Sequence, residues 1–175
     1  RLIDNLEKKF GGEWYVCIRV HPQLAPTFSE YKNPEVQSRL IDESQADDMY
    51  EILAAMDAYI TDYSSACFEA GFAHIPVFIY ADDIEYAKDR GALMWNIATD
   101  PRHDVDNNKK FTLNMDVKFP FPIASDNEQL EEDIMKFRQD EYDNRLDIFH
   151  EKVGLVFNGN ASEKLANTIF GKLRL

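Results

Sequence analysis

The chain has 175 residues, of which 45% are hydrophobic and 13% aromatic, enough apolar material for one domain with a real core. Its 32 acidic residues outnumber the 19 basic ones and give a formal net charge of -13. Such an excess of negative charge repels nucleic acid and anionic lipid, so we expect no nucleic-acid partner. A local anion site built from backbone N–H groups remains compatible with this charge.

Only two cysteines occur, Cys17 and Cys67, and neither has a C-x-x-C partner. We expect free, buried thiols, which fits a reducing compartment. No stretch approaches the roughly 20 apolar residues that span a bilayer, and no signal peptide pattern opens the chain. The first residues, Arg1-Leu2-Ile3-Asp4, resemble the middle of a helix, so we expect residues 1–175 to be one domain of a longer protein.

Apolar spacing predicts alternating helices and strands over the first 80 residues. The expected helices are 1–10, 47–56 and 64–73, and the expected strands are 14–20, 39–41, 58–61 and 76–80. This alternation is typical of a parallel sheet covered by helices on both faces. The predicted fold class is therefore α/β, with a Rossmann-like parallel sheet.

The second half of the chain has a weaker pattern. Residues 83–89 suggest a helical turn, and the polar stretch 98–118 suggests an excursion loop or hairpin. Three C-terminal helices are expected within 126–175. Their apolar positions are Leu130, Ile134 and Phe137, then Tyr142, Leu146, Phe149 and Val153, and finally Leu165 and Ile169.

The junction Asp62-Tyr63-Ser64-Ser65 lies between a predicted strand and a predicted helix. Asp62 or Ser64 could simply cap the helix, which both residue types do well. Alternatively, the helix N-terminus and the two hydroxyls could hold a phosphate beyond the carboxyl end of the strand. A serine nucleophile is disfavoured because the flanking glycines of a G-x-S-x-G elbow are absent.

A second candidate group is Arg19-x-His21-Pro22, at the carboxyl end of the strand predicted over 14–20. His21 could act as a general base, donate to a phosphate oxygen, or only order its own loop. Arg90, beside Gly91, is a third candidate, because a cation there could bind a diphosphate. His74, His103 and His150 lie apart without metal-ligand spacing, so we expect neither a metal nor another cofactor.

Taken in order, these motifs resemble the C-terminal half of the CDP-glycerol glycerophosphotransferases, which build or prime teichoic acids and related polymers. The resemblance covers nearly all of the chain except residues 98–118. Its motifs are Arg19-Val20-His21-Pro22, AAMDAYITDYSSACFEAG, IPVFIYADDIEYAKDRG, FPIASDNEQLEEDI and NGNASEKLANTIF.

The resemblance implies a nucleotide-binding domain, the C-terminal domain of a GT-B architecture. It implies that the pyrophosphate of a CDP-polyol lies against Asp62, Tyr63, Ser64 and Ser65, and that His21 is functionally important. Arg19 and Arg90 are expected to contribute to binding the nucleotide and its pyrophosphate, and Glu69 stands where the family usually has an aspartate. The implied reaction transfers a polyol phosphate to a polyprenol-linked acceptor, with the whole protein cytoplasmic and peripheral at the inner face of the plasma membrane.

Two competing functions remain open from the sequence. One is a GT-B glycosyltransferase or epimerase domain that uses a UDP-sugar, because such folds bind phosphates in the same way. The other is a non-catalytic nucleotide-binding or scaffolding domain, with residues 98–118 as a partner surface. In either enzyme reading, we expect the 175 residues alone to be inactive because half of the cleft would be missing.

Overall fold

The computed structural model describes residues 1–20, 37–84, 86, 119–156 and 158–173. Its helices are α1 (Leu2–Phe10), η1 (Gln37–Arg39, a 3-10 helix), α3 (Met49–Ala54), α4 (Ala66–Phe72), α6 (Asn127–Lys136), α7 (Gln139–Lys152) and α8 (Ala161–Leu173). Its strands are β1 (Val16–Ile18), β2 (Leu40–Asp42), β3 (Tyr59–Thr61), β4 (Val77–Tyr80) and β5 (Ile123–Ala124). The loop predicted over 98–118 and most of the turn predicted over 83–89 lie outside the described residues.

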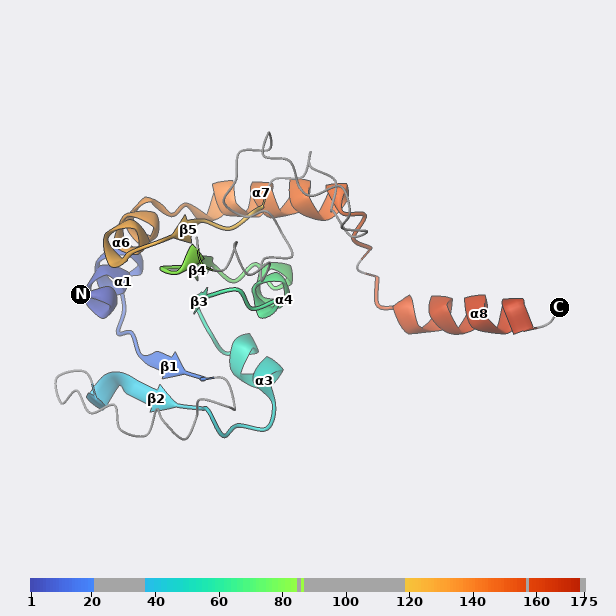
Figure 1. Ribbon diagram of the computed structural model, residues 1–175, viewed down its shortest axis with the longest axis horizontal. Helices are drawn as coiled ribbons and strands as arrows, with labels where there is room; N and C mark the ends of the chain where they lie inside the picture. The colour runs from blue at the N-terminus through green and yellow to red at the C-terminus, as the bar shows by residue number, and fades with distance from the viewer. Residues whose placement is uncertain (21–36, 85, 87–118, 157, 174–175) are drawn as a thin grey trace.

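The strands form two parallel sheets (Figure 1). One contains β1 and β2, with Cys17 opposite Ile41. The other has the order β3-β4-β5, with Ile60 opposite Phe78 and Ile79 opposite Ile123. The predicted α/β class with parallel strands is therefore confirmed, but the strands are divided between two sheets. Strands of two to four residues offer few ladder hydrogen bonds, so their period alone does not determine which edges pair.

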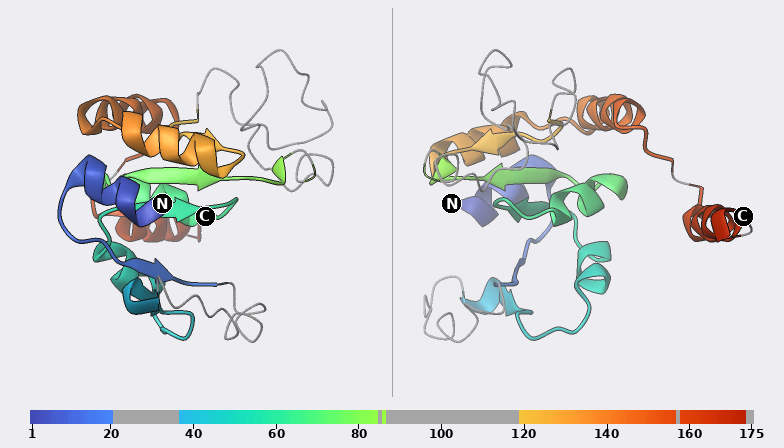
Figure 2. Two further views of the ribbon diagram at one scale, coloured as in Figure 1. Left: turned by 90° about the vertical axis from the view of Figure 1, so that its left-hand side faces the viewer. Right: turned by 45° about the vertical axis from the view of Figure 1, so that its right-hand side comes forward.

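Helices cover both faces of the three-stranded sheet. Helix α6 contacts β4 and β5, while α4 contacts β3 and β4. Figure 1 places α6 and α1 on one side of these strands and α4 on the other, and Figure 2 shows the same layers from two further directions. Helix α7 packs on α4, where the rings of Phe68 and Phe149 stack with centroids 5.9 Å apart.

The core lies around β4 and the two late helices α6 and α7. The largest fully buried side chains are Tyr142, Phe78, Ile79, Ile134, Leu146 and Val77. The apolar positions expected on α6 and α7 thus form much of the core, as the helical spacing predicted. The hydroxyl of Tyr142 donates a 2.7 Å hydrogen bond to the Ile75 carbonyl oxygen, so this buried polar group is satisfied.

Aspartate caps fix where two helices begin. The carboxylate of Asp48 accepts from Tyr50 N at 2.7 Å, and that of Asp126 accepts from Gln129 N at 2.9 Å. Each bond satisfies a backbone N–H that the first turn of a helix leaves without a partner. The expected start of α3 at Asp47 is therefore two residues too early.

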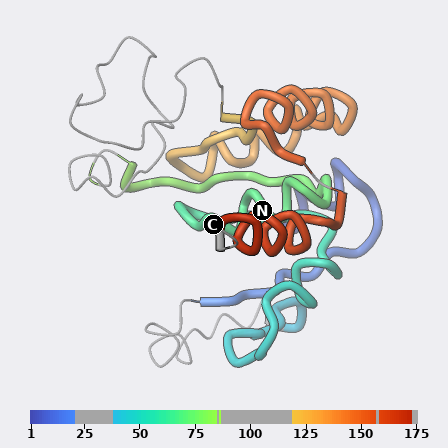
Figure 3. The backbone as a smooth tube through the Cα atoms, turned by 90° about the vertical axis from the view of Figure 1, so that its right-hand side faces the viewer, coloured from blue at the N-terminus to red at the C-terminus, as the bar shows by residue number. Residues whose placement is uncertain are grey.

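Helix α8 projects away from the rest of the domain in Figure 1, and in Figure 3 it lies in front of the domain because that view looks along the direction of projection. Leu165, Ile169 and Phe170 on this helix are exposed, so the third predicted late helix forms without contributing to the core. Within the part of the chain that the structure describes, no helix combines the length and apolar character that crossing a membrane requires.

Candidate functional site

The segment Asp62–Ser65 joins β3 to α4 and combines a cap with exposed polar groups. Ser64 Oγ accepts a 3.3 Å hydrogen bond from Ala66 N, the first residue of α4. Ser65 occupies the N-cap position but makes no capping hydrogen bond through its side chain. Of the two residues expected to cap the helix, Asp62 and Ser64, it is Ser64 that accepts from the first turn, and the exposed Ser65 hydroxyl makes no capping bond.

A hydrogen bond from Tyr63 connects this segment to the residues that follow β4. The Tyr63 hydroxyl donates a 2.6 Å hydrogen bond to Asp83 Oδ1. Burial, followed by this hydrogen bond and the nearby carboxylates, raises the pKa of Tyr63 well above the ordinary tyrosine value. The phenol therefore stays protonated and remains a donor across the physiological pH range. The hydroxyl of Tyr63 thus connects two loops, and its expected role in nucleotide binding stays a prediction.

Arg19 follows β1, and its guanidinium is held by backbone carbonyl groups. Its Nη1 donates to the carbonyl oxygens of Glu43 at 3.0 Å and Ala46 at 2.7 Å. The backbone N–H of the next residue, Val20, donates to Ser44 Oγ at 3.2 Å. Because carbonyl partners carry no formal charge, the positive charge of Arg19 is not neutralised by these contacts.

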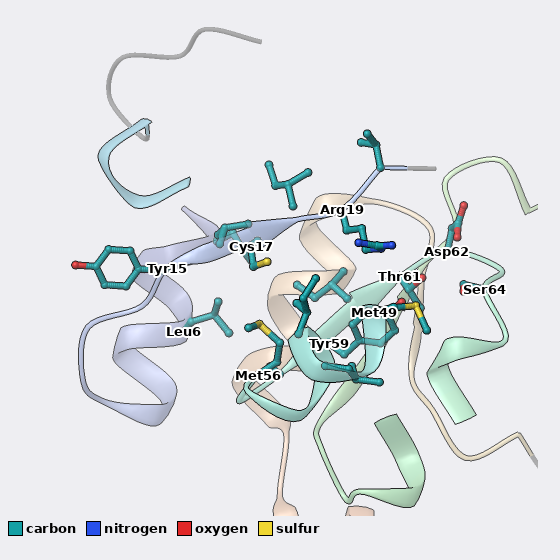
Figure 4. Close-up of a pocket in the computed structure, with 18 of the residues that line it drawn as sticks. Leu6, Tyr15, Cys17, Arg19, Met49, Met56, Tyr59, Thr61, Asp62 and Ser64 are labelled. Carbon is teal, nitrogen blue, oxygen red and sulfur yellow. The ribbon is translucent and has the colours of Figure 1, made fainter. Parts of the chain in front are cut away.

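A cavity of about 1010 Å³ separates β1 from β3 and connects the two candidate groups. Its lining is mostly apolar and includes Leu6, Trp14, Val16, Ile18, Ile52, Leu53, Met56 and Ile60. Arg19, Thr61, Asp62 and Ser64 also line it. Figure 4 shows these four residues at one end of the cavity and Tyr15 at the other. Arg19 and Ser64, from two different strand ends, therefore line the same cavity.

The polar end of this cavity has the groups that an anion requires. The guanidinium of Arg19 supplies charge, and the Ser64 hydroxyl supplies a donor, whereas the N–H groups of Ala66, Cys67 and Phe68 at the start of α4 already donate to Ser64 and Ser65. The exposed carboxylate of Asp62 opposes an anion, so Arg19 is needed to offset it. Among the described residues, no group of three or more histidine, cysteine or acidic side chains could hold a metal ion.

Three other expected site residues are not among the described residues that line this cavity. Glu69 is exposed in the first turn of α4 and does not belong to the residues that line the cavity. His21 and Arg90 lie outside the described residues. From the sequence we missed Asp83 as the partner of Tyr63 and Ser44 as the partner of Val20. The acidic pair Asp82-Asp83, which follows Ala81 at the end of β4, was the available signal for the first.

The two cysteines are free thiols. Cys67 is buried in α4, and burial raises its pKa to about 11, so it is an unreactive thiol at neutral pH. Cys17 is only partly buried, because it lines the cavity. The expectation of a buried thiol is therefore confirmed for Cys67, while Cys17 is intermediate.

The chain is similar to teichoic acid polymerases and primases over most of its length. The teichoic acid poly(glycerol phosphate) polymerase of Staphylococcus epidermidis is 28% identical over 171 residues, which are 95% of this chain and 21% of that protein. The teichoic acid ribitol-phosphate primase of Bacillus spizizenii is 24% identical over 158 residues, 90% of this chain and 34% of that protein. The chain therefore spans about a fifth to a third of these two relatives.

The fold matches a solved structure over nearly its whole length. The wall teichoic acid polymerase TagF superimposes with a TM-score of 0.63 at 26% identity, over 98% of this chain and 38% of that one. A histidine-to-asparagine variant of TagF soaked with CDPG gives a TM-score of 0.62 at 25% identity, with 98% and 37% coverage. This likeness confirms the expected fold class, the C-terminal domain of a GT-B architecture.

The sequence of residues 3–102 matches the family described as CDP-Glycerol:Poly(glycerophosphate) glycerophosphotransferase. The matched region contains β1, β3, α4 and β4, and with them Arg19 and Ser64, which line the polar end of the cavity. The chain belongs to the CDP-glycerol:poly(glycerophosphate) glycerophosphotransferase family.

Proposed function

We propose that this domain binds the CDP part of a CDP-polyol such as CDP-glycerol, and that the complete protein transfers the polyol phosphate to a lipid-linked acceptor. The observation that carries the proposal is that Arg19 and Ser64 line one end of the same cavity. Family membership and the similarity to a polymerase soaked with CDPG support the choice of nucleotide.

In this proposal the pyrophosphate lies between the end of β1 and the start of α4. Arg19 offsets the negative charge, and the hydroxyls of Ser64 and Ser65 donate hydrogen bonds. Attack by an acceptor hydroxyl oxygen on the β-phosphate forms the new P–O bond and breaks the bond to the α-phosphate. CMP then leaves with the bonding electrons, and the donors at the polar end stabilise its added charge.

Three residues enter the proposal through the resemblance to the family. His21 takes the proton of the acceptor hydroxyl or donates to a phosphate oxygen, and Arg90 binds the diphosphate. Glu69 contacts the ribose, for which its exposed position one turn into α4 leaves the carboxylate accessible. Replacement of His21 by alanine in the complete protein should abolish transfer if His21 is the base, and substantial remaining turnover would place the base elsewhere.

The rest of the reaction requires parts beyond these 175 residues. The lipid-linked acceptor is proposed to bind another domain, and the complete protein is proposed to act at the inner face of the plasma membrane. Since the chain spans only 38% of TagF, we expect it to bind nucleotide without turning it over. Transfer activity of the isolated chain would overturn this part of the proposal.

Calorimetric titration of the chain with CDP, CDP-glycerol and a UDP-sugar tests the proposed nucleotide class. We expect both cytidine nucleotides to bind at least about tenfold more tightly than the UDP-sugar, a difference of about 1.4 kcal/mol. Tighter binding of the UDP-sugar would favour a glycosyltransferase or epimerase domain instead. Absence of binding to all three nucleotides would favour a scaffolding role.

A further inference from the structure

The segment Asp42–Ala46, which follows β2, forms a turn that holds the guanidinium of Arg19. A 3.1 Å hydrogen bond from Ala46 N to the Glu43 carbonyl oxygen closes the turn and brings the carbonyl groups of these two residues together. Both carbonyl oxygens accept from Arg19 Nη1, that of Glu43 at 3.0 Å and that of Ala46 at 2.7 Å. The turn therefore fixes one nitrogen of the guanidinium on both of its N–H groups.

The contacts of Nη1 leave another edge of the Arg19 guanidinium open. Among the described residues, no acceptor is hydrogen-bonded to its Nε or Nη2. The N–H groups on these two nitrogens are parallel, the arrangement with which arginine binds a phosphate or carboxylate through paired hydrogen bonds. Arg19 is exposed and lies at the polar end of the cavity, with Asp62 and Ser64 (Figure 4). The open edge can therefore receive an anion at that end.

Ser44 connects the turn both to the end of β1 and to Asp42. Its Oγ accepts from the backbone N–H of Val20, the residue after Arg19, over 3.2 Å. Its own backbone N–H donates to Asp42 Oδ1 over 3.0 Å. The hydrogen bond from the Ser44 hydroxyl, followed by that from its backbone N–H, lowers the pKa of the Asp42 carboxyl below its ordinary value. Asp42 therefore stays ionised at neutral pH and keeps accepting from Ser44.

Ser44 does not belong to the residues that line the cavity, so it affects a ligand there only through Arg19. An arginine side chain that moves freely loses much rotamer freedom when it binds a ligand, and fixing it beforehand removes that cost from binding. Carbonyl groups fix Arg19 without neutralising it, whereas a carboxylate partner would compete with an anionic ligand for its charge. The turn thus orients the cation and leaves its charge to the ligand.

We propose that Ser44 is a positioning residue for nucleotide binding, because it shapes the turn that holds Arg19 with its Nε and Nη2 edge open to the diphosphate. Asp42 supports this role as the acceptor for Ser44. The identity of the ligand as a diphosphate rests on the proposed function. The hold of the turn on Arg19 does not depend on that function, so the two can be tested separately.

NMR relaxation of the Arg19 Nε–H group in the nucleotide-free chain tests whether the turn holds this side chain. The signal is identified by its loss in Arg19→Ala. We expect an order parameter above about 0.6 in the parent chain and a value in the flexible range below it in Ser44→Ala. Ser44→Thr retains a hydroxyl and should keep the parent value. Equal order parameters in the parent chain and in Ser44→Ala would overturn the positioning role.

Calorimetric titration with CDP tests the effect of the turn on the site. We expect Ser44→Ala to weaken CDP binding by about three- to tenfold, the effect of one lost hydrogen bond. Ser44→Thr should restore the affinity of the parent chain. Gln45→Ala is the matched control, because Gln45 is exposed in the same turn, and it should bind CDP as the parent chain does. An affinity of Ser44→Ala equal to that of Gln45→Ala would contradict the proposal.

A second background separates positioning from a merely structural role. In Arg19→Ala, the further change Ser44→Ala should not weaken CDP binding any more, because the side chain that it positions is gone. The same loss of affinity in both backgrounds, with urea unfolding showing that the variants are folded, would show that Ser44 does not act through Arg19. If the parent chain does not bind CDP at all, the proposed function fails, and the relaxation measurement still decides whether the turn holds Arg19.

Discussion

The hydroxyl of Tyr63 donates to Asp83 Oδ1 over 2.6 Å and thereby joins the loop after β3 to the loop after β4. These two loops follow adjacent strands of one parallel sheet, so the bond fixes the loop that carries Ser64 and Ser65 relative to its neighbour. In the proposed site, this bond positions the donors before the ligand arrives. Asp83 is then a positioning residue, which acts through Tyr63.

Replacement of Tyr63 by phenylalanine should weaken CDP binding several-fold and lower the free energy of unfolding by about 1 kcal/mol, the net value of one hydrogen bond. Asp83→Asn keeps an acceptor for the phenol and should retain most of the affinity. Tyr50→Phe, on the exposed surface of α3, is the matched control. Calorimetry measures the affinity for CDP, and urea unfolding measures the stability. Unchanged affinity in Tyr63→Phe would show that the hydrogen bond to Asp83 does not position the loop for binding.

Tyr142 should make the protein sensitive to alkali. Burial raises its pKa above the ordinary value of 10.0, so the folded state keeps the phenol neutral while the unfolded state ionises. Its contribution to stability is therefore complete below pH 10 and is lost as the pH rises above that value, by up to about 1.4 kcal/mol per pH unit. Above pH 10, the free energy of unfolding of Tyr142→Phe should fall less steeply with pH than that of the parent chain. At neutral pH the variant should be less stable, because the Ile75 carbonyl loses its hydrogen-bond donor. An equal dependence of the unfolding free energy on pH in the two proteins would show that Tyr142 does not cause the sensitivity to alkali.

Gly71 is required where α4 meets the core. A Cβ there would lie 2.9 Å from Phe121 Cζ and 3.3 Å from Leu146 Cδ2, and both of these side chains are buried. Gly71→Ala should therefore cost about 1–3 kcal/mol of stability. Gly171→Ala in α8 is the control, because its Cβ meets nothing within 4 Å and should only increase helix propensity. Thermal unfolding of both variants distinguishes steric overlap from a general effect of alanine.

His74 combines a left-handed backbone with a side-chain hydrogen bond to Asp143 on α7. Its φ is 56°, and its Nδ1 lies 2.8 Å from Asp143 Oδ1. His74→Asn keeps a residue type that tolerates this backbone and loses only a half-exposed pair, so we expect a cost below about 1 kcal/mol. His74→Val should cost about 1–2 kcal/mol more, because a branched side chain is strained at this φ. Equal unfolding midpoints in urea for the two variants would refute the contribution of the backbone.

Local patterns predicted most of the elements correctly. The spacing of Leu130, Ile134 and Phe137 indicated α6, and the short apolar runs indicated β3 and β4 to within one residue at each end. These features depend on periodicity and on residues close in sequence. β5 was not identified as a strand, because two residues, Ile123 and Ala124, are too few to show a period.

The candidate site was predictable in part. Placement of Arg19 and Ser64 at the carboxyl ends of parallel strands follows from the fold class, and the structure shows both at one cavity. The bond from Tyr63 to Asp83 was not predictable, because it joins residues 20 apart in sequence through tertiary packing. Likewise, no local pattern indicates that β1 and β3 stand apart.

A double-mutant cycle on CDP binding tests the central claim, that the two strand ends form one anion site. Arg19→Ala and Ser64→Ala should each weaken binding by about tenfold or more, whereas the control Ser125→Ala should not. The double variant should lose less than the sum of the two single effects, because both residues hold the same diphosphate. The account would be contradicted if CDP bound equally well to the parent chain and to both single variants, with thermal unfolding showing that all of them are folded.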